Sequence, residues 1–111
     1  MPAATVDLTF AALADPGRRR VLDLVARQPV TVTDLAGHLE VTVPAALKQV
    51  RALEAAALVV TTKVGRTRWC ALSPDAGADA ETWLTSRRAM WHRRVDRFEK
   101  HLNNQQKEQR K

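Results

Sequence analysis

The apolar residues of this chain change their spacing twice along the sequence, and those changes limit the folds the chain can adopt. Up to about residue 57 they recur every three to four positions, which is the period of helices packed on a core. Two β-prone runs follow, 58–62 and 67–72, joined through Gly65, which can take a positive φ. From about residue 78 to 102 the chain has neither Pro nor Gly and predicts one long helix. We therefore expect a mainly α fold of order α-α-α-α-β-β-α with a small β-hairpin.

The first two helices are short, and a capping signal separates them. The first covers 6–13, where three apolar residues fall on one face: Val6, Phe10 and Leu13. Asp15 can cap the second helix, with Pro16 at its first helical position. The pair Gln28-Pro29 ends that helix, because proline cannot continue it.

The third and fourth helices form a closely joined pair. Thr31 and Asp34 have the spacing of a capping box at the head of a helix of about two turns, 32–39. After a tight turn at 40–41, Thr42 can cap a fourth helix that runs to about residue 57. Its apolar face is expected to comprise Val43, Ala46, Val50, Leu53 and Ala57. The opposite face, free to meet a partner, is expected to comprise Pro44, Ala45, Lys48, Arg51, Ala52 and Ala55.

The charge of the chain indicates a polyanionic partner. Its formal net charge is +6 and its isoelectric point about 10.4, which is high for 111 residues. The apolar fraction of 45% is ordinary for a globular domain, so the chain is expected to fold. A basic balance of this size favours nucleic acid as the partner.

Several other classes of protein are disfavoured. The longest apolar run, 55–60, is too short to cross a bilayer, and the N-terminus lacks the features of a signal peptide. The single cysteine, Cys70, cannot form an intramolecular disulfide, which fits a reducing cytoplasm. No glycine-rich phosphate loop, nucleophile elbow or recognisable carboxylate pair is present, so no enzymatic activity and no cofactor are expected.

The order of the elements specifies a winged helix-turn-helix, and that arrangement fits double-stranded DNA. The major groove admits one α-helix, while a hairpin beside it can reach the neighbouring backbone or minor groove. The basic residues lie where this requires, on the outer face of the fourth helix and around the hairpin tip. The candidate DNA-binding residues are Thr42, Pro44, Ala45, Lys48, Gln49, Arg51, Lys63, Arg66, Arg68 and Arg18.

The long last helix carries a repeating apolar seam. Its members are separated by 7, 4, 3 and 4 residues, which is the spacing of a helix that packs along another helix: Leu84, Trp91, Val95, Phe98 and Leu102. The wholly polar segment 103–111 is expected to be disordered. We therefore assign residues 1–102 to a single winged helix domain and 103–111 to a polar tail.

Three stretches of the chain resemble the ArsR family of bacterial winged-helix repressors. They are FAALADPGRRRVLDLVA, VTVTDLAGHLEVTVPAALKQVRALEAAALV and TTKVGRTRWCALSP, and the resemblance covers about residues 6–102. The branch it most resembles ends in a Trp- and Arg-rich helix, here WLTSRRAMWHRRVDRFEKHL. The resemblance implies a homodimer held by the first and last helices, with Val6 and Phe10 joining the seam residues at the interface. It also implies repression at an operator with two half-sites about 34 Å apart.

The chain departs from the family pattern in its fourth helix. Leu47 and Gln49 stand where a Ser and a His are usual, and Ala57 stands where a Gly usually closes the helix. Few hydrogen-bonding groups then remain to read bases, so backbone contacts are expected to supply most of the affinity. Specificity per base pair is expected to be modest or to depend on DNA shape.

The metal site best known in the family is missing. Its paired cysteines correspond to Thr31 and Thr33, which offer no thiolate. On the last helix His92, Asp96 and His101 offer nitrogen and oxygen ligands for zinc between subunits, but a solvated pair of His92 and Asp96 at i, i+4 is the favoured interpretation. We expect no metal. A small-molecule effector is compatible with the resemblance, and no residue identifies one.

Several side chains allow two interpretations. Cys70 is expected to pack inward rather than to act as a redox switch. Trp69 has two equal interpretations, as a stacking surface for DNA or a partner subunit, or as cover for an adjacent helix. Trp83, with two aromatic residues of the seam, is assigned to an interface in preference to a small-molecule pocket. Of the run 18–20, one arginine is expected to reach DNA.

The main rival hypothesis is a winged-helix dimer that binds proteins and no specific DNA. Leu47 and Ala45 make the outer face of the fourth helix less polar, which permits this alternative. Recognition of structured RNA is more remote, because a helix with a wing beside it suits duplex DNA.

Overall fold

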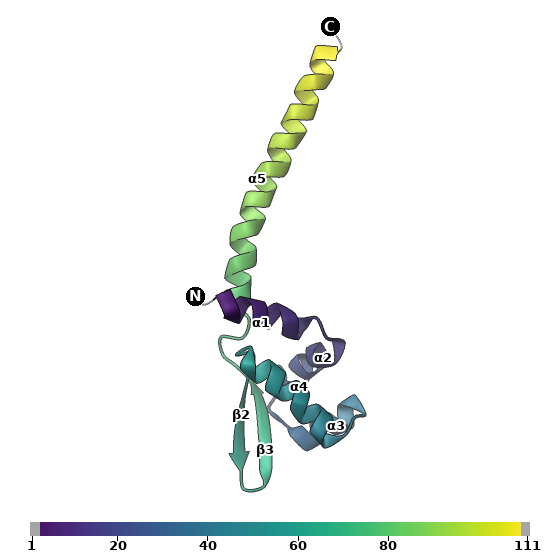
Figure 1. Ribbon diagram of the computed structural model, residues 1–111, viewed down its shortest axis with the longest axis vertical. Helices are drawn as coiled ribbons and strands as arrows, with labels where there is room; N and C mark the ends of the chain where they lie inside the picture. The colour runs from purple at the N-terminus through teal and green to yellow at the C-terminus, as the bar shows by residue number, and fades with distance from the viewer. Residues whose placement is uncertain (1–2, 110–111) are drawn as a thin grey trace. The chain divides into compact units, whose positions relative to one another are not determined.

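The computed structural model describes residues 3–109 and contains five α-helices and three β-strands within that range (Figure 1). In chain order they are α1 (Ala3–Leu13), α2 (Pro16–Val25), β1 (Val30–Thr31), α3 (Val32–Leu39), α4 (Val43–Ala55), β2 (Val59–Val64), β3 (Thr67–Leu72) and α5 (Ala78–Gln109). The predicted order of four helices, a hairpin and a long helix is confirmed, and one short strand, β1, is added to it.

Side-chain caps define where three of the helices begin, as predicted. Asp15 Oδ2 accepts a hydrogen bond from the backbone N–H of Arg18 at 3.0 Å and caps α2. The hydroxyls of Thr31 and Thr42 accept from the third residues of α3 and α4, at 3.1 and 3.2 Å. Each bond satisfies a backbone donor that has no partner inside the helix.

Helices α3 and α4 both end through a residue in the left-handed conformation. Glu40 has φ 57° and lets the N–H of Val41 reach the carbonyl of Ala36 at 3.1 Å. Ala57 has φ 58° and lets the N–H of Leu58 reach the carbonyl of Leu53 at 3.0 Å. These 6→1 bonds are typical of the Schellman motif, in which glycine is the usual left-handed residue. The first creates the tight turn between α3 and α4, and the second turns the chain from α4 into β2.

The sheet is antiparallel and has the strand order β1-β3-β2. Strand β1 was not predicted, because it is two residues long and pairs only with the distant residues Cys70 and Trp69. The hairpin is also tighter than predicted. Strand β2 continues to Val64, so only Gly65 and Arg66 connect it to β3, and Gly65 has the expected positive φ of 62°.

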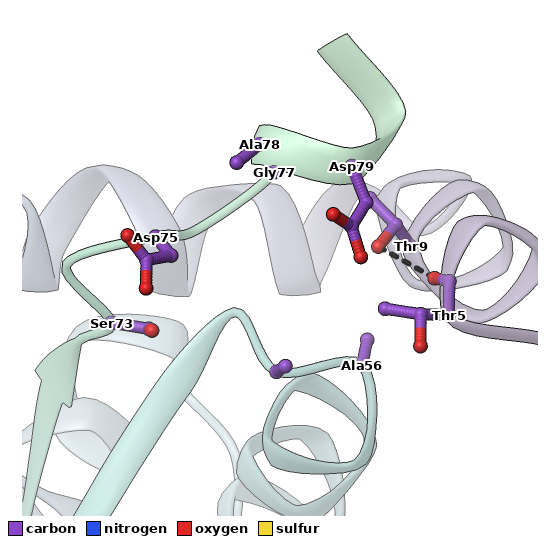
Figure 2. A pocket seen from close by; sticks show the side chains of 9 residues that line it. Thr5, Thr9, Ala56, Ser73, Asp75, Gly77, Ala78 and Asp79 are labelled. Carbon is purple, nitrogen blue, oxygen red and sulfur yellow. Dashed lines mark hydrogen bonds between the residues drawn. The ribbon is translucent and has the colours of Figure 1, made fainter. Parts of the chain in front are cut away.

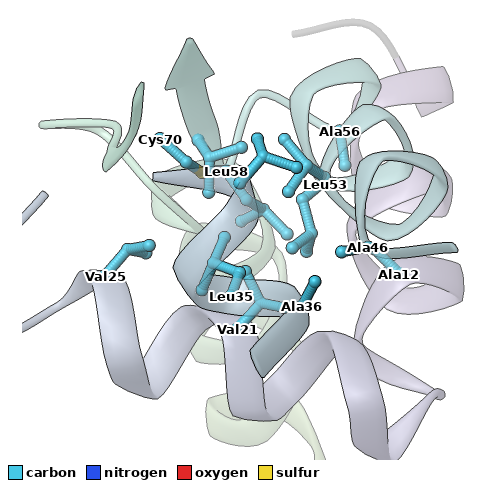
Figure 3. Close-up of a cluster of buried hydrophobic side chains, with 13 residues drawn as sticks. Ala12, Val21, Val25, Leu35, Ala36, Ala46, Leu53, Ala56, Leu58 and Cys70 are labelled. Atoms are coloured by element: carbon cyan, nitrogen blue, oxygen red, sulfur yellow. The ribbon is translucent and has the colours of Figure 1, made fainter. Parts of the chain in front are cut away.

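The hydrophobic core lies where α2, α3 and α4 meet the sheet. Figure 3 shows side chains from these elements pointing toward one another: Val21 and Val25 of α2, Leu35 and Ala36 of α3, Ala46 and Leu53 of α4, and Cys70 of β3. The predicted inner face of α4 is correct at its centre, where Ala46, Val50 and Leu53 are fully buried. It is wrong at both ends. Val43 is 43% exposed because the core does not extend to the first turn, and Ala57 is exposed because the helix has ended, so Ala56 is buried instead.

The contacts within the chain divide it into two units, up to Ala80 and from Glu81 onward. The first unit contains α1 to α4 and the sheet, and the second consists of the remainder of α5. Helix α5 is described to Gln109, whereas the sequence predicted that it ends at Leu102 and is followed by a disordered tail. Residues 103–109 contain no Pro or Gly and several strong helix formers, which explains the continuation. Arg110 and Lys111, at the end of the expected tail, lie outside the described residues.

The lengths and compositions of the helices bear on membrane insertion. None of those described between residues 3 and 109 combines the length and the apolar composition of a bilayer span.

The left-handed Ala57 generates a stability prediction. Glycine at this position avoids the steric cost that a Cβ imposes at positive φ, so we expect Ala57→Gly to raise the free energy of unfolding by about 1 kcal/mol. Its neighbour Ala56 has φ −87° and is buried, so Ala56→Gly serves as the control and is expected to lower that free energy. Urea unfolding followed by circular dichroism measures both. A loss of stability in Ala57→Gly would contradict the strain assigned to the end of α4.

Candidate nucleic-acid interface

Helix α4 presents an exposed row of side chains on the face opposite its buried one. Pro44, Lys48 and Arg51 are all exposed and lie one helical turn apart. Within residues 3–109, no hydrogen bond or ion pair engages the side chain of Lys48 or Arg51. The two cations are therefore available to a partner.

The β2–β3 hairpin adds a second basic group beside α4. Lys63 lies directly opposite Arg68 in the antiparallel register, and Arg66 is exposed at the tip. Like charges directly opposite each other destabilise a strand pair. The hairpin therefore concentrates positive charge near its tip.

Arg68 also connects the hairpin to α4. Its Nη1 donates to the hydroxyl of Thr61 at 3.1 Å, and that hydroxyl donates to Oε2 of Glu54 at 2.6 Å. Arg68 is half-buried as a result. The sequence predicted Arg68 as a DNA contact; the structure gives its guanidinium a role in holding the hairpin against the helix.

A shallow hollow of about 180 Å³ lies between the first half of α4 and the hairpin. Its lining includes the apolar side chains of Val32, Val43 and Leu47 together with Arg66 and Arg68. Leu47 is half-buried in this position and does not belong to the exposed row of Lys48. The hollow therefore combines an apolar surface with a basic edge.

Two of the predicted DNA contacts are engaged inside the chain. Gln49 is half-buried, and its Nε2 donates to Asp15 Oδ2 at 3.1 Å while its Oε1 accepts from Arg18 Nη1 at 3.2 Å. The guanidinium of Arg18 also donates to two backbone carbonyls of α1. Neither side chain has the outward orientation that the sequence predicted, because partners 31 and 34 residues away are not visible in a local pattern.

The remaining candidates on α4 are less free than Lys48. Thr42 is exposed, but its hydroxyl oxygen already accepts from the N–H of Ala45. Ala45 is half-buried. The exposed basic set on α4 and the hairpin is therefore Lys48, Arg51, Lys63 and Arg66.

An acidic cavity lies at the opposite end of α4. It measures about 360 Å³, and Figure 2 shows Asp75 and Asp79 beside it with the hydroxyls of Thr5, Thr9 and Ser73. The Thr9 hydroxyl donates to the carbonyl of Thr5 at 2.9 Å. Carboxylates repel a polyanion, so this cavity is unsuited to the partner that the basic side chains of α4 and the hairpin favour.

Helix α5 exposes all five residues of its predicted apolar seam. The exposed fractions of Leu84, Trp91, Val95, Phe98 and Leu102 lie between 43% and 62%. Trp83 and Trp91 make an edge-to-face contact with ring centroids 6.4 Å apart, and Arg87 lies over the Trp83 ring. On α1, Phe10 is 38% exposed, which leaves it available for its predicted place at an interface. Val6 is buried within its own chain, so its predicted place at an interface is wrong. Leu8, which was not predicted as an interface residue, is exposed.

Thr31, which caps α3, and Thr33, inside that helix, supply no thiolate to a metal. Thr31 uses its hydroxyl as a helix cap and Thr33 is exposed. Among residues 3–109, no three His, Cys, Asp or Glu side chains gather closely enough to hold an ion. His101 Nε2 lies 3.2 Å from the amide of Gln105 on the next turn of α5.

Cys70 packs inward, as predicted, and is fully buried in the core. Burial, and secondarily the charge of Glu54, raise the pKa of its thiol from 9.0 to about 11. The thiolate is the reactive form of cysteine, so the environment makes this side chain inert near neutral pH.

Comparisons with known proteins agree with this geometry. A family model described as a helix-turn-helix domain matches residues 13–62. A transcriptional repressor, an SmtB homolog from Synechocystis, is 41% identical over 66 residues, which are 60% of this chain and 50% of the repressor, so the chain matches only half of that relative's length. A crystal structure of an ArsR family transcriptional regulator is 34% identical with a TM-score of 0.76, over 83% of this chain and 95% of that one.

The chain belongs to the ArsR family of transcriptional regulators. The family and its fold are those of regulators without enzymatic activity. The solution structure of a homodimeric winged helix-turn-helix DNA-binding domain from Mycobacterium bovis shares the fold at 22% identity and a TM-score of 0.61, over 80% of each chain. In this ArsR protein α3 and α4 are accordingly the helix-turn-helix pair, and the β2–β3 hairpin is the wing.

The buried thiol of this ArsR protein generates a prediction about reactivity and pH. At pH 8 a thiol with a pKa of about 11 is about 0.1% ionised, so Cys70 of the native protein is expected to resist alkylation by iodoacetamide. Once the protein is unfolded in urea, the same thiol should react with the reagent. Below pH 9 the thiol is protonated in both the folded and the unfolded state. Between pH 9 and 11 the unfolded state loses the proton first, so stability falls with rising pH.

The variant Cys70→Ala is the control for the alkaline part of that experiment, because it lacks this ionisation. Its free energy of unfolding should decline less steeply between pH 9 and 11 than that of the unchanged protein. Rapid alkylation of the native protein at pH 8 would contradict the buried position of Cys70.

Proposed function

We propose that this protein is a transcriptional regulator, a repressor, that binds a DNA operator with two half-sites as a homodimer through α4 and the wing. The observation that carries the proposal is the unengaged basic set of Lys48, Arg51, Lys63 and Arg66 on a helix and a hairpin of one unit. An α-helix fits the major groove, and a hairpin beside it can reach the flanking backbone. We call α4 the recognition helix from here on.

Backbone contacts supply most of the binding free energy in this proposal. Each cation that neutralises a phosphate releases condensed counterions, so affinity falls steeply with salt. The exposed row of α4 offers Lys48 and Arg51 for hydrogen bonds, while Pro44 supplies only apolar contact. Gln49 is hydrogen-bonded to Arg18 and Asp15, so few side chains of α4 are available to form hydrogen bonds with bases. In this proposal the sequence-dependent shape of the DNA supplies much of the specificity.

Dimerisation through α5 completes the proposal. A helix of 32 residues with an apolar seam exposed along its length requires a covering surface, and a second copy of the same seam provides one. The Mycobacterium bovis domain with this fold is a homodimer. Two recognition helices about 34 Å apart would enter successive major grooves on one face of a duplex.

Replacement of Lys48 tests the recognition helix. We expect Lys48→Ala to weaken duplex binding by about 1–3 kcal/mol, uniformly across sequences if the side chain contacts phosphate and selectively if it contacts a base. Fluorescence anisotropy with a selected operator and with bulk duplex DNA, over a range of salt concentrations, distinguishes these outcomes. A phosphate contact reduces the salt slope by about 0.9.

The matched control is Arg27→Ala, which removes an exposed arginine just after α2, outside both the basic set and the run 18–20. It should leave affinity close to that of the unchanged protein. Absence of binding to any duplex at low salt would overturn the proposal and favour the alternative, a winged-helix module for protein association.

Replacement of seam residues tests the dimer. Trp91→Ala and Phe98→Ala remove large exposed apolar side chains, so each should weaken self-association by about 2 kcal/mol or more, which is about 30-fold in Kd. Sedimentation equilibrium measures this. Lys100→Ala, on the polar side of α5, should leave the Kd unchanged, and an intact dimer in both seam variants would exclude the seam as the interface.

A further inference from the structure

Arg18 joins three helices through its guanidinium. Its Nε donates to the carbonyl of Ala12 at 2.8 Å and its Nη2 to the carbonyl of Ala11 at 3.0 Å, both in the last turn of α1. Its Nη1 donates to Oε1 of Gln49 on the recognition helix at 3.2 Å. One side chain from the start of α2 therefore binds two carbonyls in the last turn of α1 and also contacts α4.

Asp15 closes this arrangement into a ring. Its Oδ2 accepts from the N–H of Arg18, which caps α2, and from Nε2 of Gln49, at 3.0 and 3.1 Å. Gln49 thus accepts from the guanidinium with one end of its amide and donates to the carboxylate with the other. We call Asp15, Arg18 and Gln49 the Arg18 network.

The residue between the two charged members leaves room for this ring. A Cβ added to Gly17 would lie 3.0 Å from Asp15 Oδ2 and 3.2 Å from Gln49 Nε2, which is closer than such contacts normally are. Glycine has low helix propensity, so its place in the first turn of α2 lowers the stability of that helix. Close approach of α2 to the Gln49 amide explains why this position has no side chain.

The network acts on the part of α4 that the proposed function uses. Gln49 directly follows Lys48, and all three network members are half-buried, so their bonds are partly shielded from water. Helices α1, α2 and α4 contact one another pairwise around them. A charge-assisted network of this kind resists rotation and sliding of α4 against α1 and α2.

We propose that the Arg18 network is a positioning device that holds the recognition helix in its DNA-binding orientation, and that Arg18 and Gln49 act on DNA affinity without touching DNA. The inference rests on the proposed function. It differs from the obvious alternative, in which Arg18 neutralises a phosphate and Gln49 reads a base, because each side-chain nitrogen and oxygen of both residues already has a hydrogen-bond partner inside the chain.

Four variants test the network: Arg18→Ala, Gln49→Ala, the double variant and Gly17→Ala. We expect each to weaken binding about tenfold for operator and bulk duplex alike. The salt slope and the base preference at every operator position should stay unchanged. The double variant should bind no more weakly than Arg18→Ala alone, because both changes remove one network.

Gly17→Ala separates positioning from general stability. Alanine improves helix propensity in α2, so a purely structural role predicts unchanged or higher stability and unchanged binding. The network predicts weaker binding, since the added Cβ would lie 3.0 Å from Asp15 Oδ2 and 3.2 Å from Gln49 Nε2 and would force these two atoms of the network to shift. Circular dichroism at the assay temperature verifies that each variant is folded, and Arg27→Ala is again the matched control.

Several outcomes overturn the inference. A salt slope reduced by about 0.9 in Arg18→Ala would identify a phosphate contact. Preference lost at a single base pair in Gln49→Ala would identify a base contact. Full affinity in all four variants would leave the network without a role in binding, while absence of binding by the unchanged protein would instead overturn the proposed function.

Discussion

Burial of one face of α4 is the interaction on which the rest of the structure depends. Ala46, Val50 and Leu53 are fully buried among side chains of α2, α3 and the sheet. Each larger apolar side chain removed from water contributes about 1.5–3 kcal/mol, which is more than a typical neutral hydrogen bond contributes on balance. Because a helix has two sides, the same burial directs Lys48 and Arg51 outward. The basic surface is thus a consequence of core packing rather than a separate device.

Polar contacts then restrict the two flanks of α4, where burial alone allows movement. On one flank Gln49 is bound by Asp15 and Arg18, and on the other Glu54 is bound to the wing through Thr61 and Arg68. A hydrophobic contact is non-directional and tolerates sliding, whereas a hydrogen bond specifies distance and angle. The helix therefore divides its polar residues: those on its flanks orient it, and those on its outer row remain free for a partner.

The parts of this architecture that depend on neighbouring residues could be predicted from the sequence. The caps at Asp15, Thr31 and Thr42 and the turn at Gly65 are local, and each appears where its residue type predicts it. The engagement of Gln49 and the strand β1 depend on contacts across 30 residues or more, so no periodicity reveals them. A weak signal for the former was present in Gly17, a glycine inside a helical pattern that has a packing reason.

The length of α5 imposes a further condition on the molecule. From Glu81 onward it forms a unit of its own whose side chains are almost all exposed, so the contacts of a packed core do not hold it. Helices are cooperative but only marginally stable in water without tertiary contacts, and the exposed seam from Leu84 to Leu102 adds an apolar surface that favours association. Pairing of two such seams would stabilise both helices at once, which makes the order of α5 dependent on protein concentration. Folding of α5 and formation of the proposed DNA-binding homodimer would then be a single equilibrium.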